Sequence, residues 1–158
     1  MSPIALTAWK IGSVMRHLCD ANVWVALSLE NHGARPRCLE WYGTLRNSDT
    51  LAFCRFSQQS YLRLLTTKAF TGDEVRTNRQ ALAAYRQLWE SPHVDWLEEP
   101  EELENLWFKY ADLSSSSPKI WMDAYLAAFA VLSNSQLVTF DKGFRVYKGL
   151  DWIDLNQR

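Results

Sequence analysis

The stretch MRHLCDANVWVAL, residues 15–27, contains the change of pattern that decides the fold. The apolar pair Leu18-Cys19 predicts a buried β-strand over residues 16–20, and residues 22–30 are predicted to be a helix. A strand that leads directly into a helix opens a β-α unit, the building block of a parallel sheet. Asp20 stands at the junction, either as the cap of the helix or as a carboxylate presented at the end of the strand.

The same alternation of short apolar runs and longer helical patterns continues to the end of the chain. Further strands are predicted at 51–54, 94–97, 136–140 and 152–154. Further helices are predicted at 35–46, 57–67, 74–90, 101–111 and 119–133, with a short turn at 142–146. This order predicts one α/β domain over residues 15–158 with a parallel sheet at its centre.

Composition sets wider limits on function. The chain has 158 residues, 47% of them apolar, and a net charge of −1, so any nucleic-acid partner would have to be held by a local basic patch. No apolar run reaches the length of a membrane span, and three cysteines without metal-ligand spacing favour reduced, partly buried thiols. We therefore expect a cytoplasmic protein. Residues 1–14 are expected to be an N-terminal extension, with an extra packed strand or arm as the alternative.

Three aspartates lie where an α/β fold would bury them. Asp20 and Asp141 each close a predicted strand, and the carboxyl ends of parallel strands form the edge at which such folds bind ligands. Asp123 lies within the apolar helical stretch 120–132, close enough to its start to reach the same edge. Alone, Asp141 also suits a turn, as Asp20 suits a cap. Buried together, the three would need a cation, and carboxylate oxygens are the ligands of Mg²⁺.

Three segments carry a resemblance to a known family. They are LCDANVW (18–24), WMDAYLAAFA (121–130) and VTFDKGF (138–144). In order, spacing and flanking residues they resemble the PIN domain family, and more narrowly the VapC toxins of bacterial type II toxin–antitoxin modules. The resemblance covers roughly Met15 to Leu155. It implies a PIN-like α/β/α sandwich with a central, mostly parallel sheet of about five strands.

The resemblance also implies an activity, a cofactor and partners. It implies an endoribonuclease that depends on Mg²⁺ or Mn²⁺, that is held inactive by a VapB-type antitoxin and that forms a homodimer. Asp20, Asp123 and Asp141 match three members of the acidic cluster of the family. The chain departs from the family at the fourth, where Gln58 stands in place of a frequent glutamate and puts a second metal ion in doubt.

Other residues have supporting roles in this interpretation. Asn22 either faces the site or caps its helix. Four basic residues are candidates for RNA binding or are ordinary solvated charges: Lys119, Lys142, Arg145 and Arg63. An exposed apolar patch at Trp24, Trp41 and Tyr42 is expected to serve a homodimer or an antitoxin helix.

Two other classes of protein remain open. The first is a degenerate PIN domain that binds RNA or protein without hydrolysis, an alternative suggested by Gln58 in place of the frequent glutamate. The second is a phosphatase-type enzyme with Asp20 as nucleophile, which is disfavoured because Asn22 stands where the second acid of that chemistry would be and no glycine loop for phosphate is present.

Overall fold

A computed structural model of the chain describes residues 14–157 and contains a five-stranded, fully parallel sheet. The strands are β1 (Arg16–Cys19), β2 (Thr50–Phe53), β3 (Val94–Trp96), β4 (Gln136–Thr139) and β5 (Trp152–Asp154), in the spatial order β3-β2-β1-β4-β5. The first strand is therefore central, with β2 on one side and β4 on the other. The predicted strands and the parallel sheet are confirmed.

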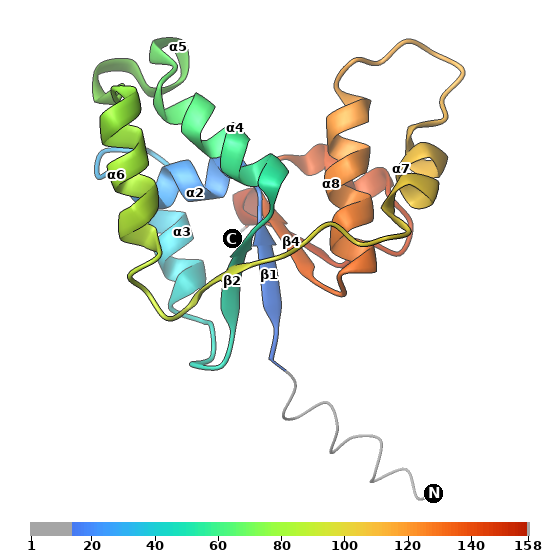
Figure 1. Ribbon diagram of the computed structural model, residues 1–158, viewed down its shortest axis with the longest axis horizontal. Helices are drawn as coiled ribbons and strands as arrows, with labels where there is room; N and C mark the ends of the chain where they lie inside the picture. Colours follow the sequence, from blue (N-terminus) through green and yellow to red (C-terminus); the bar gives the residue numbers. More distant parts are fainter. Residues whose placement is uncertain (1–13, 158) are drawn as a thin grey trace, which may run out of the picture.

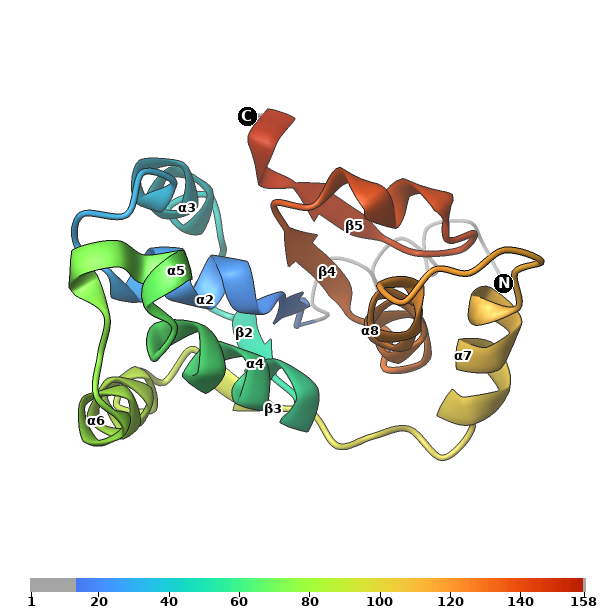
Figure 2. The ribbon, with the colours of Figure 1, turned by 90° about the horizontal axis from the view of Figure 1, so that it is seen from above.

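Helices connect the strands on both faces of the sheet (Figures 1 and 2). They are α2 (Ala21–Ser28), α3 (Arg35–Tyr42), α4 (Arg55–Leu65), α5 (Lys68–Thr71), α6 (Asn78–Leu88), α7 (Leu103–Ala111) and α8 (Ile120–Leu132), with 3₁₀ turns η1 (Gly72–Glu74), η2 (Lys142–Val146) and η3 (Leu155–Gln157). Helices α2, α3, α4 and α6 lie to one side of the strands, and α7 and α8 lie to the other. The three layers are those expected from the PIN resemblance.

Alternating side chains of the strands form a separate core on each face of the sheet. Cys19 and Val138 belong to the core that also contains residues of α2, α3, α4 and α6. Leu18 and Leu137, their neighbours in sequence, belong to the core that contains α8 and parts of α7. Because both faces are covered, the central strands are apolar at successive positions, which is the pattern that the sequence displays.

Three predicted helices have clearly different boundaries in the structure. The helix predicted at 57–67 begins at Arg55 because Ser57 closes its first turn, where Ser57 Oγ accepts from the Cys54 N–H at 2.9 Å. The helix predicted at 74–90 is α6, which begins only at Asn78. Thr77 caps it, accepting from the Gln80 N–H at 3.2 Å while Gln80 Oε1 accepts from the Thr77 N–H at 2.9 Å. The helix predicted at 35–46 is also shorter and ends at Tyr42.

The predicted patch at the first two helices is wrong for both tryptophans. Trp24 and Trp41 are each 1% exposed. Trp24 stacks on Phe53 at 3.9 Å between ring centroids, and Trp41 meets His17 edge-on at 5.5 Å. These large rings fill the core between the sheet and the two helices, so only Tyr42 remains on the surface.

The backbone of Met15 is bonded to the segment that leads into β2. Its N–H donates to Asp49 Oδ1 at 3.2 Å, and its carbonyl accepts from the Thr50 N–H at 3.0 Å. Val14 is exposed, and residues 1–13 of the expected extension lie outside the described residues. Cys19, Cys38 and Cys54 are buried free thiols, as expected. Within residues 14–157 no helix is long and apolar enough to cross a membrane.

Candidate active site

The sheet brings Asp20 and Asp141 to one edge. Strands β1 and β4 are parallel neighbours, with Cys19 opposite Val138, so their carboxyl ends lie side by side. Asp20 follows β1 directly, and its N–H donates to the Val138 carbonyl at 2.9 Å. Asp141 follows β4 after one intervening residue. The prediction that both aspartates lie at the carboxyl edge is confirmed by this pairing.

Asp20 is both a helix cap and part of the site, so the two interpretations of the sequence are compatible. Its Oδ1 accepts from the Ala21 N–H at 2.8 Å, at the start of α2. Its Oδ2 accepts from the Thr139 hydroxyl at 2.8 Å. The two bonds use both oxygens and fix the carboxylate at the end of the strand.

Thr139, which the sequence motifs did not single out, bonds one of the candidate site residues directly. Its side chain is fully buried, and its Oγ1 also accepts from the Asp141 N–H at 3.0 Å. Thr139 therefore joins Asp20 to the backbone of Asp141. The signal was a hydroxyl residue in an apolar strand, two positions before the aspartate that closes it.

The pKa of Asp20 depends on the charges of the two other aspartates. The pKa of Asp20 is raised from 3.8 to about 6, chiefly by burial and also by the charges of Asp123 and Asp141, against the lowering effect of the bonds from Thr139 and Ala21. Each of the two other carboxylates thus disfavours the ionised form of Asp20. A cation among them would relieve that repulsion.

Asp123 and Asp141 share a cation from the chain itself. The Lys119 ammonium lies 3.2 Å from Asp123 Oδ2, one helical turn away, and also donates to Asp141 Oδ2. Burial raises the pKa of Asp123 despite this bond. Asp141 is also affected by burial, but the bonds from Lys119 and from the Gly143 N–H outweigh it and lower its pKa. The pKa of Lys119 is raised, chiefly by its bond to Asp141.

The donor set fits a hard divalent ion. The oxygens of Asp20, Asp123 and Asp141 are the ligand type that Mg²⁺ and Mn²⁺ take, and the mutual repulsion at Asp20 is the effect that such an ion offsets. Among residues 14–157 no three acidic, histidine or cysteine side chains are already gathered closely enough to hold a metal by themselves. The ion-paired Lys119 stands between two of the three acids.

Gln58 is not brought to the acids. Its Oε1 accepts from Arg55 Nη1 at 2.6 Å, and its Nε2 donates to the Tyr85 hydroxyl of α6 at 3.0 Å. The spacing from the strand end suggested a glutamate-like position, but the side chain is turned toward α6. The expected contribution of Gln58 to the cluster is therefore corrected.

Asn22 lies beside the acids, on the first turn of α2. It lines an open depression of about 650 Å³ with Asp141, Lys142, Asp154 and Asn156, among others. Its Oδ1 is buried without a hydrogen-bond partner in the described part of the chain. Asp154 was not singled out from the sequence, although it closes β5 as Asp20 closes β1, and its Oδ1 accepts from the Asn156 N–H at 2.9 Å.

The four basic candidates are distributed unequally. Lys119 bonds Asp123 and Asp141. Lys142 lines the depression next to Asp141, and Arg145 lies in η2, the turn that begins directly after Asp141. Arg63 instead lines a different depression, against α6. The structure thus brings three of the four to the elements that carry the acids.

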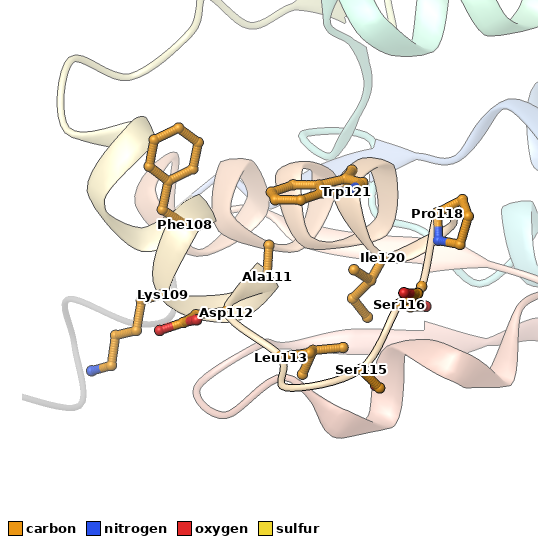
Figure 3. A pocket seen from close by; sticks show the side chains of 11 residues that line it. Phe108, Lys109, Ala111, Asp112, Leu113, Ser115, Ser116, Pro118, Ile120 and Trp121 are labelled. Carbon is orange, nitrogen blue, oxygen red and sulfur yellow. The ribbon is translucent and has the colours of Figure 1, made fainter.

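A groove of about 920 Å³ runs between the end of α7, the loop 113–118 and the start of α8 (Figure 3). Phe108 of α7 and Trp121 of α8 are 49% and 52% exposed along it. Trp121 is fixed through its carbonyl, which accepts from Trp107 Nε1 at 2.7 Å. Trp121 lies two residues before Asp123 on α8, so the two side chains leave the helix on different sides, and none of the three aspartates lines the groove.

Comparison with known proteins gives a consistent result. The PIN domain family matches residues 18–150. Ribonuclease VapC41 of Mycobacterium tuberculosis (strain CDC 1551 / Oshkosh) is 41% identical over 138 residues, which are 85% of this chain and 94% of that protein.

Solved structures share the fold at lower identity. VapBC-1 from nontypeable Haemophilus influenzae has a TM-score of 0.64 and 21% identity, over 90% of this chain and 99% of that one. Mycobacterium tuberculosis VapC20, described as a sarcin-ricin loop cleaving toxin, has a TM-score of 0.57 and 17% identity, over 81% and 92% of the two chains. Fold, acid cluster and sequence relatives agree: the chain belongs to the PIN domain family, and within it to the VapC ribonucleases.

Proposed function

We propose that this protein is the toxin of a VapBC-type module, an endoribonuclease that hydrolyses RNA phosphodiester bonds with Mg²⁺ or Mn²⁺. The observation that carries the proposal is geometric: Asp20 and Asp141 follow the paired strands β1 and β4, and the Lys119 ammonium bonds Asp141 together with Asp123 of α8. The 41% identity to a ribonuclease over most of both chains supports the reaction class.

The carboxylates of Asp20, Asp123 and Asp141 would hold the metal, and hydrogen bonds from neighbouring residues fix the positions of Asp20 and Asp141. When bound, a divalent ion supplies positive charge to a phosphate and acidifies water for attack on phosphorus. Thr139 and the Ala21 N–H orient Asp20, while the Gly143 N–H donates to Asp141 Oδ1 at 2.8 Å. Ligands fixed in this way lose little conformational freedom when an ion binds.

The surface around the acids supplies the contacts to RNA. Lys142 and Arg145 follow Asp141 in η2 and offer charge to backbone phosphates without reading sequence. Asn22 lines the same depression, and its buried Oδ1, which has no hydrogen-bond partner among the described residues, suits an ordered water. Arg63, beside α6, is not part of this surface.

Partners follow from the same family. We propose a VapB-type antitoxin as inhibitor and a second copy of the chain as dimer partner, in the cytoplasm. Solved complexes named VapBC are among the structures that share the fold. On this chain, Tyr42 is the only residue of the expected patch that is exposed, and together with Leu39, which is also exposed on α3, it is our candidate for an interface.

One alternative has a specific observation in its favour. A degenerate PIN domain would bind RNA or protein without hydrolysis, and here Gln58 is bonded elsewhere while Lys119 occupies two of the acids. The two functions differ in one measurable property, which is metal-dependent cleavage.

The test is cleavage of total RNA and defined oligonucleotides by the purified protein with Mg²⁺, with Mn²⁺ and with excess EDTA. We expect cleavage only with metal, and loss of cleavage in Asp141→Asn. Asp112→Asn is the matched control because Asp112 lies at the end of α7, in the groove and not in the cluster. Undiminished cleavage in EDTA, or in Asp141→Asn, would refute the proposal, and absence of cleavage under every condition would favour the binding module.

A further inference from the structure

Lys119 has an unusual place for a basic residue of a proposed phosphate-cleaving site. Its ammonium bonds Asp123 and Asp141 at once, and these are two of the three carboxylates expected to hold the metal. Its side chain is nevertheless 66% exposed, against 21% and 28% for the two acids. The charge lies inside the cluster while the stem of the side chain remains free to move into solvent.

A lysine and a divalent ion make incompatible demands on these carboxylates. Asp123 Oδ2 and Asp141 Oδ2 each direct a lone pair at Lys119 Nζ. A carboxylate bonded to an ammonium is a weaker ligand, and the two cations repel each other at short range. Such an exposed pair is also weak enough for a divalent ion to displace it.

We infer that Lys119 is an internal counter-ion that competes with the metal for Asp123 and Asp141, and that metal binding releases it to bind an RNA phosphate. The inference rests on the proposed function and adds a step to it. The chain supports the second half through position: Lys119 immediately precedes α8, at the edge that also carries Lys142 and Arg145. Once free of the acids, its ammonium is a phosphate ligand next to the site of cleavage.

The inference requires reciprocity between metal and RNA. If the metal frees Lys119 and RNA then binds it, each ligand raises the affinity for the other by the same factor. In a protein without the Lys119 ammonium, nothing competes with the metal for the two aspartates. Such a protein should bind the metal more tightly, and RNA should raise its metal affinity by a smaller factor. The same protein with arginine at this position retains a charge that can pair with both acids.

The experiment measures Mn²⁺ affinity by calorimetry at low salt for the full-length protein and for three variants, Lys119→Met, Lys119→Arg and Lys142→Met. We expect Lys119→Met to bind Mn²⁺ roughly two- to fivefold more tightly than the parent, the range for exposed ion pairs. Lys119→Arg should stay close to the parent. Lys142→Met, which removes a neighbouring charge without a bond to the acids, should change affinity by less than Lys119→Met. A non-cleavable 2′-O-methyl oligonucleotide should tighten Mn²⁺ binding more in the parent than in Lys119→Met.

The outcomes separate this inference from the proposed function. If the parent binds Mn²⁺ and cleaves RNA but Lys119→Met binds Mn²⁺ no more tightly, the competition is refuted and the nuclease stands. If Lys142→Met raises the Mn²⁺ affinity as much as Lys119→Met does, the effect comes from the overall positive charge near the site, and a specific exchange between Lys119 and the metal is refuted. Equal tightening by the oligonucleotide in both proteins refutes the release step. A parent that neither binds Mn²⁺ nor cleaves RNA overturns both proposals.

Discussion

Replacing Asp20 with asparagine should stabilise the metal-free protein at neutral pH. The pKa of Asp20 is about 6 in the folded chain, raised first by burial and then by Asp123 and Asp141, against an ordinary value of 3.8. Between these two values the folded protein binds a proton that the unfolded chain does not. The free energy of unfolding therefore falls as pH rises from about 4 to about 6 and is flat above that window.

The size of the effect follows from the shift. A difference of about two pKa units, at about 1.4 kcal/mol per unit, costs the folded state up to about 3 kcal/mol at pH 7.5. Asparagine does not ionise, and its side chain can still accept from the Ala21 N–H and bond Thr139. Asp20→Asn should thus gain about 1–3 kcal/mol, or about 3–10 °C in melting temperature for a domain of this size.

The assay is thermal and urea unfolding of both proteins in EDTA from pH 4 to pH 8. The variant should be more stable than the parent at pH 7.5, and the difference in stability should narrow as pH falls toward 4, where Asp20 is protonated in the folded state and becomes partly protonated in the unfolded chain. Added Mn²⁺ should then stabilise the parent, by mass action on the folded state, and have little effect on the variant. A variant that is less stable than the parent at pH 7.5 without metal, or a gap that does not depend on pH, would show that Asp20 is not held in this environment.

Three further predictions test other parts of the structure. Deletion of residues 1–14 should leave folding and cleavage unchanged, because the deletion keeps Met15, whose backbone bonds Asp49 and Thr50, and a melting temperature lower by more than several degrees would contradict this. Gln58→Glu should leave the Mn²⁺-dependent stability shift unchanged, because the side chain is turned away from the acids, and a larger shift in the variant would show that it reaches them. Thr139→Val should lower thermal stability by about 1–3 kcal/mol and weaken Mn²⁺ binding, since it leaves Asp20 without its buried donor; unchanged Mn²⁺ affinity by calorimetry would remove Thr139 from the site.

The sequence predicted the elements whose signals are local. Strand β4 is an apolar run closed by Asp141, and Asp20 ends an equivalent run, so the carboxyl edge could be located from pattern alone. The rest depends on where a side chain turns after the chain has folded. Gln58 has the spacing from β2 that the family glutamate has, but its side chain bonds Tyr85 of α6. Trp41 is buried in the core, which no local sequence pattern indicated.

The contacts of Lys119 and Thr139 illustrate the same limit. Lys119 could be identified from the sequence as a cation near an acid, because Asp123 lies one helical turn away. Its second bond, to Asp141, joins residues 22 positions apart, and the Thr139 bond to Asp20 joins residues 119 positions apart. Such pairs depend on the order of strands in the sheet, which the sequence motifs do not state.

The strand order has a consequence for the protein during its synthesis. A ribosome makes β1, β2 and β3 first, and these three can pair as one half of the sheet while β4 is still untranslated. The edge of β1 that will receive β4 stays open, and Asp20 has neither Thr139 nor Asp141 beside it. A nascent chain therefore has no complete acid cluster until nearly its whole length has been released. Under the proposed function, synthesis that stops before β4 yields a fragment that lacks Asp141 and therefore the complete metal site.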